Sequence, residues 1–141
     1  MVSVDRMRHC CAVAEYMRNY VKCNAENCEV RAEDAYMVGL LHDIGYGFMD
    51  GPGHASMGGL MLRRNSFEYW KEVYFHGSVS GEYESEMLDL LNNADLHVDG
   101  HGNQVSFELR LNDIKNKYGE DSAQFKNALA LVQKLKKKGF E

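Results

Sequence analysis

The sequence predicts an all-α fold, a single-domain helical bundle of about six or seven helices over residues 1–141. Two observations carry this prediction. Apolar residues recur at spacings of three and four along most of the chain, which is the period of a helix with one buried face. No long alternating strand pattern, internal repeat or Pro- or Ser-rich linker interrupts them. The length of 141 residues is that of one ordinary domain.

The first helical pattern covers residues 4–22, where Met7, Cys10, Ala14 and Met17 share one face. A second pattern runs through Ala35 and Val38 and ends at Gly45, with His42 and Asp43 in its last turn. Residues 45–53 contain four glycines and the only proline, so we expect an irregular loop there.

The remaining helices are predicted at residues 54–65, 67–76, 84–98, 107–118 and 122–138. Gly58 and Gly59 weaken the first of these as a helix, and close packing against another backbone would explain them. The last helix ends in a lysine run, Lys134–Lys138, which complements the negative end of the helix dipole.

The composition excludes several classes of protein. A net charge of −5 argues against a general nucleic-acid binder, because such proteins need a basic face to neutralise phosphates. Charged residues near the N-terminus interrupt the apolar stretch that a secretory signal sequence needs, and no apolar segment is long enough to span a membrane. We therefore expect a cytoplasmic protein. The four cysteines form no CxxC pair, which favours reduced thiols over a disulfide or a zinc site.

Histidines and aspartates near helix ends are the candidates for chemistry. His42 and Asp43 leave one helix end beside the glycine-rich segment, where a metal could lie between them. A carboxylate has two oxygens and can bind two cations, whereas one imidazole nitrogen binds one, so Asp43 is the natural bridge and the candidate catalytic residue. Asp95 lies among Leu91, Ala94 and Val98, and a carboxylate buried there needs a metal or a cationic partner.

The order of these residues resembles that of the HD superfamily of metal-dependent phosphohydrolases. The segments RMRH with His9, AYMVGLLHDIGY with His42 and Asp43, and NNADLH with Asp95 match its H, HD and D motifs. Two further segments, GHASMGGLML with His54 and YFHGS with His76, resemble the subset with two extra histidines, the diadenosine tetraphosphate hydrolase-like proteins. The resemblance spans residues 6–95.

The resemblance implies a binuclear metal site. It assigns His9, His42, Asp43 and Asp95 to one metal, and Asp43, His54 and His76 to a second. Nitrogen-rich ligand sets of this kind suit iron, manganese, zinc or similar divalent ions. Arg6 lies one helical turn before His9, so it can point toward the same site. The resemblance implies a place near a substrate phosphate for this arginine, and the alternative is a surface ion pair. We expect His97 and His101, which match no motif, to face solvent.

The function that the resemblance implies is hydrolysis of a nucleotide or other small phosphate ester by metal-activated water. Two alternatives use the same residues: a di-iron oxygenase, and a regulatory module that binds metal or nucleotide without turnover. The diadenosine tetraphosphate subset usually continues with Glu-Pro and a nearby Arg after the last aspartate, whereas this chain reads ADLHVDGHG, which weakens that substrate assignment. The partner expected is a small molecule, not a nucleic acid or a membrane, and the sequence leaves the oligomeric state open.

Overall fold

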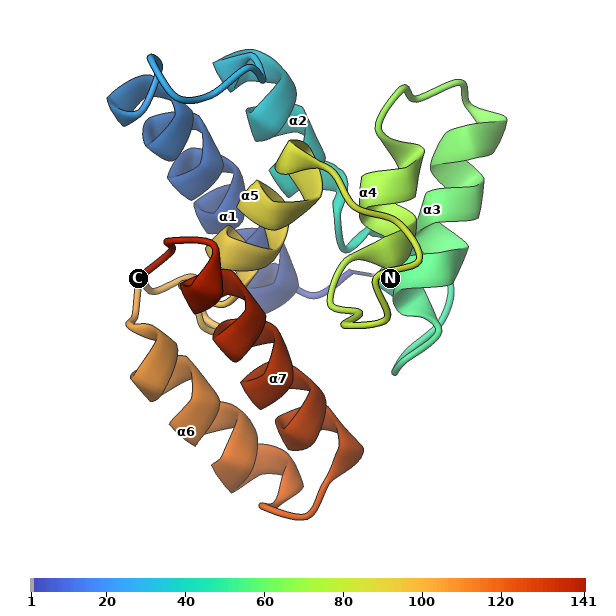
Figure 1. Cartoon of the computed structure of the whole chain (residues 1–141). Coiled ribbons are helices and arrows are strands. Elements are labelled where there is room, and N and C mark those ends of the chain that lie inside the picture. Colours follow the sequence, from blue (N-terminus) through green and yellow to red (C-terminus); the bar gives the residue numbers. More distant parts are fainter. Residues whose placement is uncertain (1) are drawn as a thin grey trace.

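A computed structural model describes residues 2–141, and within these residues it contains seven α-helices and no strand (Figure 1). The predicted all-α fold is therefore confirmed. The helices are α1 (Val4–Cys23), α2 (Ala32–Leu41), α3 (His54–Arg64), α4 (Trp70–Phe75), α5 (Glu86–Asp95), α6 (Phe107–Tyr118) and α7 (Ala123–Lys137), with a short 3₁₀ helix, η1 (Ile44–Gly47), between α2 and α3.

Serine residues begin four of these helices. The side chains of Ser3, Ser85, Ser106 and Ser122 each accept a hydrogen bond from the backbone N–H three residues later. This contact satisfies a donor that has no partner inside the helix, and such a cap contributes about 1 kcal/mol. The caps fix where the helices that carry His9 and Asp95 begin.

The larger core lies between α1, α2 and α5, the helices that group together in Figure 1. Val13, Met17, Val38, Leu91 and Ala94 are fully buried in it. Each large apolar side chain buried in this way stabilises the fold by roughly 1.5–3 kcal/mol. The core therefore holds together the three helix ends from which most of the candidate ligands project.

Helices α3 and α4 form a second layer beside this core, and glycines allow their close approach. A Cβ atom on Gly59 would lie only 2.6 Å from the backbone Cα of Tyr74 in α4, and one on Gly58 would lie 3.0 Å from the backbone N of Gly45. The expectation that another backbone packs against these glycines is confirmed.

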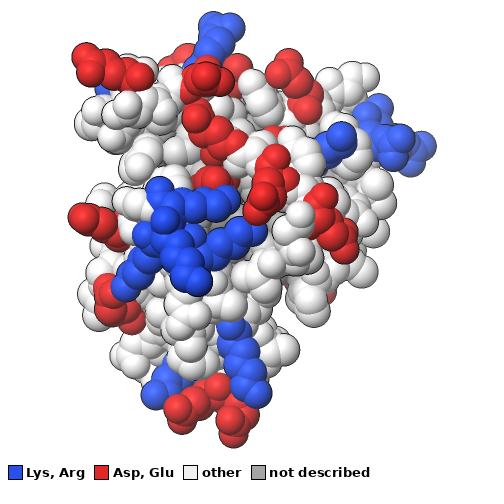
Figure 2. Space-filling view, viewed as in Figure 1, with Lys and Arg blue, Asp and Glu red and all other residues white. Residues whose placement is uncertain are grey.

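Helices α6 and α7 form an antiparallel pair around a smaller core of Phe107, Leu131, Val132 and Leu135, which Leu96 joins to the end of α5. Figure 2 shows basic side chains gathered over the C-terminal end of α7 with acidic side chains around them. The contacts there include Lys134 with Glu84 and Lys138 with Asp89. The lysine run at the helix end thus also ties α7 to residues of other segments.

Three local expectations need correction. Helix α2 ends at Leu41, so His42 and Asp43 follow it rather than forming its last turn. The glycine-rich segment begins as the regular helix η1, because hydrogen bonds from Tyr46 and Phe48 to Asp43 and Gly45 close its turns.

The third correction concerns His97, which was expected to face solvent. It is buried, its ring stacks on Tyr16 and packs on Phe107, and its Nδ1 is 2.7 Å from the carbonyl of Asn93. The ring lies between Tyr16 of the larger core and Phe107 of the smaller core, so packing of its apolar faces favours burial although its sequence neighbours are polar. His101 is exposed, as expected. Among the described helices, none is both long enough and apolar enough to cross a membrane.

Candidate metal centre

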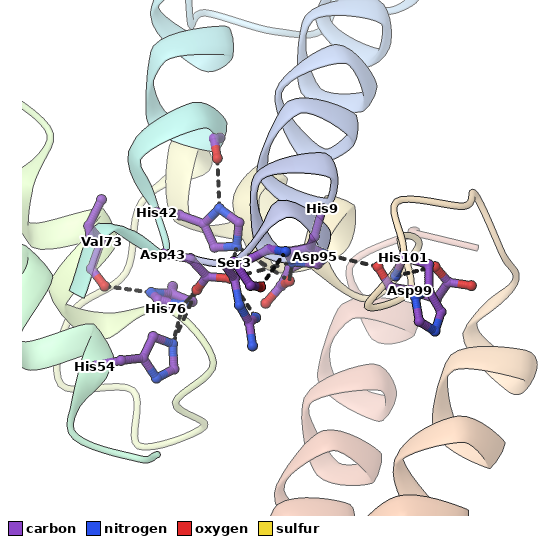
Figure 3. A network of polar contacts seen from close by, with 12 residues as sticks. Ser3, His9, His42, Asp43, His54, Val73, His76, Asp95, Asp99 and His101 are labelled. Carbon is purple, nitrogen blue, oxygen red and sulfur yellow. Dashed lines mark hydrogen bonds and ion pairs between the residues drawn. The ribbon is translucent and has the colours of Figure 1, made fainter. Parts of the chain in front are cut away.

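All six predicted metal ligands lie together, although they come from five different segments (Figure 3). His9 projects from α1, Asp95 ends α5, and His42 and Asp43 directly follow α2. His54 begins α3 and His76 directly follows α4. His9 lies inside α1, whereas the other five lie at or directly beside a helix end, and together they reach a common point that no single helix face could serve.

One carboxylate oxygen of Asp43 faces the first histidine pair. Its Oδ2 is 3.2 Å from His42 Nε2 and 3.6 Å from His9 Nε2. The Oδ1 atom of Asp95 closes this group, at 2.9 Å from His9 Nε2 and 3.5 Å from His42 Nε2. Two imidazoles and two carboxylates therefore share one small volume.

The other carboxylate oxygen of Asp43 faces the second histidine pair. Its Oδ1 is 3.2 Å from His54 Nε2 and 3.3 Å from His76 Nε2, and these two nitrogens are 3.2 Å apart. Figure 3 shows Asp43 between the two groups, with His54 and His76 on the side of α3 and α4. The carboxylate thus lies where a bridging ligand would be expected.

The other nitrogen of each histidine ring is held by a backbone carbonyl. The Nδ1 atoms of His9, His42, His54 and His76 lie 2.9, 2.7, 2.8 and 2.6 Å from the oxygens of Asp99, Gly39, Gly51 and Val73. A carbonyl only accepts hydrogen bonds, so each Nδ1 carries the hydrogen and donates it. In a neutral ring, Nε2 then presents a lone pair to the centre, which is the arrangement that metal-binding histidines use.

The electrostatics at His42 are unusual for a buried ring. Burial alone would lower the pKa of His42, but the carboxylates of Asp43 and Asp95 raise it well above its usual value. Burial alone would likewise raise the pKa of Asp43 and Asp95, yet His42 and the surrounding histidines hold both well below the usual range. The centre is therefore built to stabilise positive charge between these groups.

The residues fit a divalent metal. His42 Nε2 is buried without a well-aligned hydrogen bond in the described chain, and it lies 3.2 Å from Asp43 Oδ2 and 3.5 Å from Asp95 Oδ1, so either a proton or a bound cation is stabilised between these atoms. Donor atoms that share a cation at about 2.1 Å lie about 3.0 to 3.4 Å apart, close to the separations in both groups. Imidazole nitrogens with carboxylates suit transition ions better than calcium or magnesium.

Cys10 also lies near His42 and Asp43. Burial raises the pKa of this thiol to about 11, so it stays protonated and is a poor ligand beside two carboxylates. All four cysteines are free, as expected for reduced thiols.

Arg6 lies at the edge of the centre. Its Nη1 is 3.1 Å from Asp43 Oδ2, and its guanidinium lies 3.8 Å from the centre of the Tyr46 ring. The ion pair is not a surface contact, because the Asp43 side chain is only 4% exposed. Burial raises the pKa of Tyr46 to about 12, which keeps the phenol protonated beneath Arg6.

A cavity of about 480 Å³ opens over the centre and is also lined by residues that sequence analysis missed. Arg110 from α6 and Gln124 and Asn127 from α7 form one wall. Arg110 shares its helix face with the apolar Phe107 and Ile114, and this was the only signal in the sequence that it faces inward.

The Asp95 side chain is 22% exposed, so its carboxylate is less buried than its apolar neighbours suggested.

The HD domain family matches residues 6–120, which is most of the chain and includes all six clustered residues. The chain belongs to the HD domain family. This membership places the protein in a superfamily of metal-dependent phosphohydrolase type, whose members are generally metal-dependent hydrolases that bind divalent metals. Neither the curated proteins nor the solved structures that were compared with the chain gave a match.

Proposed function

We propose that this HD domain protein is a metal-dependent phosphohydrolase that cleaves a nucleotide or another small phosphate ester at a binuclear centre. The observation that carries the proposal is the division of the Asp43 carboxylate, with one oxygen toward His9 and His42 and the other toward His54 and His76. A site for a single ion would need only one of these groups.

In this proposal His9, His42, Asp43 and Asp95 hold one ion, and Asp43, His54 and His76 hold the other. When bound, divalent transition metals such as iron, manganese or zinc polarise phosphoryl oxygens and make water acidic enough to attack near neutral pH. The chain orients the ligands through the four Nδ1 hydrogen bonds, which fix the ring positions before an ion arrives.

Two arginines favour phosphate as the group transformed. Arg6 and Arg110 reach the same cavity from α1 and α6. Guanidinium groups match the oxygens of phosphate and form charge-assisted hydrogen bonds with them. In the proposal, Arg6 and Arg110 would hold the phosphate's peripheral oxygens, and Asp43, which Arg6 contacts, would be a metal ligand.

Metal analysis combined with a phosphate-release screen tests the proposal. Purified protein should contain two transition-metal equivalents and release inorganic phosphate from at least one class of phosphate ester. His54→Ala or His76→Ala should remove one equivalent together with the activity, while circular dichroism stays helical. His101→Ala is the matched control, because His101 is exposed and outside the centre.

Other results would favour the alternative functions. Oxygen consumption by iron-loaded protein without phosphate release would indicate a di-iron oxygenase. Full metal content with neither reaction would indicate a regulatory module. An unchanged metal content in both histidine variants would show that the centre holds one ion, with His54 and His76 only supporting it.

A further inference from the structure

We infer that the cleft over the metal centre continues into a side pocket that binds an uncharged, hydroxyl-bearing group. This inference rests on the proposed function and narrows its substrate to a phosphate monoester of a hydroxylated compound, such as a sugar or a nucleoside. It disfavours substrates that place a second phosphate in the side pocket, including dinucleoside polyphosphates.

The side pocket adjoins the main cavity. It has a volume of about 370 Å³ and shares Pro52, Ala55, His76, Gly77 and Asn127 with the cavity over the metal centre. Because His76 lines both cavities, the side pocket lies directly beside the proposed metal centre.

The boundary between the two cavities is fixed by hydrogen bonds. The backbone N–H of Gly77 donates to Asn92 Oδ1 of α5 at 2.8 Å, and its carbonyl accepts from Asn127 Nδ2 of α7. Gly77 has a φ of +80°, and a Cβ atom there would meet nothing within 4 Å, so the backbone itself forms a low boundary. Residues of α5 and α7 therefore fix the position of the backbone at this boundary.

The charges lining the two cavities differ. Arg6 and Arg110 line the main cavity, whereas no lysine or arginine is among the residues of the described range 2–141 that line the side pocket. The polar side chains that line the side pocket are those of Ser56, Tyr74, Ser78, Ser80, Glu82 and Asn127, with His76 at the boundary.

Residues 78–82, which we call the serine loop, are held by hydrogen bonds within the segment. Ser78 Oγ donates to Ser80 Oγ at 3.0 Å, and the backbone N–H groups of Ser80 and Glu82 donate to serine oxygens. Hydroxyl groups both donate and accept hydrogen bonds, so they recognise other hydroxyl groups without a net charge. A carboxylate such as that of Glu82 can accept hydrogen bonds from the hydroxyl groups of a ligand.

A second phosphate would fit this pocket poorly. It would lose part of its hydration without gaining a cationic partner, and it would lie near the negative Glu82. Glu82 is exposed, so solvent screens part of the repulsion and the expected discrimination is moderate. The phosphate is therefore expected at the arginine-lined end, and the neutral part of the substrate at the serine-lined end.

The test compares monophosphates with doubly phosphorylated compounds on the metal-loaded protein. Ribose 5-phosphate and adenosine 5′-monophosphate are the monoester probes, and fructose 1,6-bisphosphate and diadenosine tetraphosphate are the comparators. We expect a kcat/KM for the better monoester at least tenfold above that of either comparator. Comparing the kcat/KM for ribose 5-phosphate with that for adenosine 5′-monophosphate shows whether the pocket prefers a sugar or a nucleoside.

A charge reversal in the side pocket supplies the sharper experiment. Glu82→Lys should raise the kcat/KM ratio of bisphosphate to monophosphate by about five- to tenfold. Glu26→Lys changes the net charge equally at an exposed position outside both cavities and should leave the ratio unchanged. Equal ratios in wild type, Glu82→Lys and Glu26→Lys would overturn the inference.

Calorimetric binding separates this inference from the proposed function. If the metal-loaded wild-type protein hydrolyses none of these probes and no other phosphate ester in the screen, the proposed function fails. The same protein can still be titrated with ribose 5-phosphate and fructose 1,6-bisphosphate. Tighter binding of the monophosphate, reversed in Glu82→Lys, supports the side pocket as described, and equal binding overturns it.

Discussion

At the scale of single residues, the candidate metal centre depends most on Asp43, because each of its two carboxylate oxygens faces a different histidine pair. The residue is nearly inaccessible to solvent, and a buried carboxylate is tolerated only beside positive charge. His42 and Arg6 supply that charge in the metal-free chain. Metal ions would then compete with a proton on His42, so metal uptake is linked to pH.

Metal-free protein should lose stability in both acid and alkali. The folded-state pKa of Asp43 is lowered, so its contribution is complete above about pH 4 and is lost as the pH falls through that lowered value. The folded-state pKa of His42 is raised, so its contribution is complete below about pH 6.5 and is lost as the pH rises through the raised value. Urea midpoints measured from pH 3 to pH 10 after chelation check both limbs.

Two variants test which residue causes the loss of stability at low pH and which causes the loss at high pH. Relative to wild type, Asp43→Asn should reduce the fall of the urea midpoint at low pH, and His42→Gln should reduce its fall at high pH. If the wild-type and His42→Gln midpoints change in parallel above pH 7, His42 does not hold the expected proton.

Arg6 gives a second prediction at this scale. Arg6→Gln should reduce kcat/KM for the phosphate ester about thirtyfold, because a charge-assisted hydrogen bond contributes about 2 kcal/mol. Arg6→Lys keeps the charge but not the planar donor fork, and should recover only part of the loss. The control is Arg8→Gln on the same helix, where the side chain is exposed. Equal activity of the Arg6 and Arg8 variants would assign Arg6 a purely structural ion pair with Asp43.

At the scale of elements, helix periodicity was sufficient to predict the number and order of the helices, because each buries one apolar face. The order of the H, HD and D motifs was sufficient to predict His9, His42, Asp43 and Asp95 as one set of ligands from the sequence alone. Arg110 and Asn127 could not be found in this way, since only the packing of α6 and α7 against the rest of the chain brings them to the cavity. His97 was mispredicted because its glycine-rich neighbourhood masked the apolar stack on Tyr16.

The contact between α7 and the segment after α4 leads to a third prediction. Asn127 holds the carbonyl of Gly77, which directly follows His76, so it positions a proposed ligand without touching the metal. Asn127→Ala should weaken binding of one metal equivalent by roughly tenfold, the lower end of such supporting effects. Metal titration followed by calorimetry measures this change.

Gln133→Ala is the control for Asn127→Ala, because Gln133 is an exposed amide on the same helix. Asn127→Gln, which keeps the amide donor, should restore part of the affinity. A general loss of helicity, or equal weakening of both metal equivalents, would mean that Asn127 supports the fold rather than His76.

At the scale of the whole molecule, the candidate centre lies where the layer of α1, α2 and α5 meets the layer of α3 and α4. Helices α1, α2 and α5 share the larger core, while α3 and α4 pack mainly on each other and on η1. The six proposed ligands come from both layers. The fold therefore draws the two layers together at a point that concentrates polar groups, and polar groups stabilise that junction only when they are paired.

Metal should consequently stabilise the entire chain rather than a local loop. A ligand that binds only the folded state adds about 2.7 kcal/mol when its free concentration is a hundred times Kd, which for a protein of this size raises Tm by several degrees. Scanning calorimetry of metal-loaded and chelated protein should show a single transition that moves to a lower Tm on chelation. Asp43→Asn, which weakens a ligand of both proposed ions, should remove most of that difference, whereas His101→Ala should retain it. If chelation leaves Tm unchanged in the wild type although metal analysis finds two equivalents, the ions do not bind at the junction of the two layers, and the proposed ligand set is wrong.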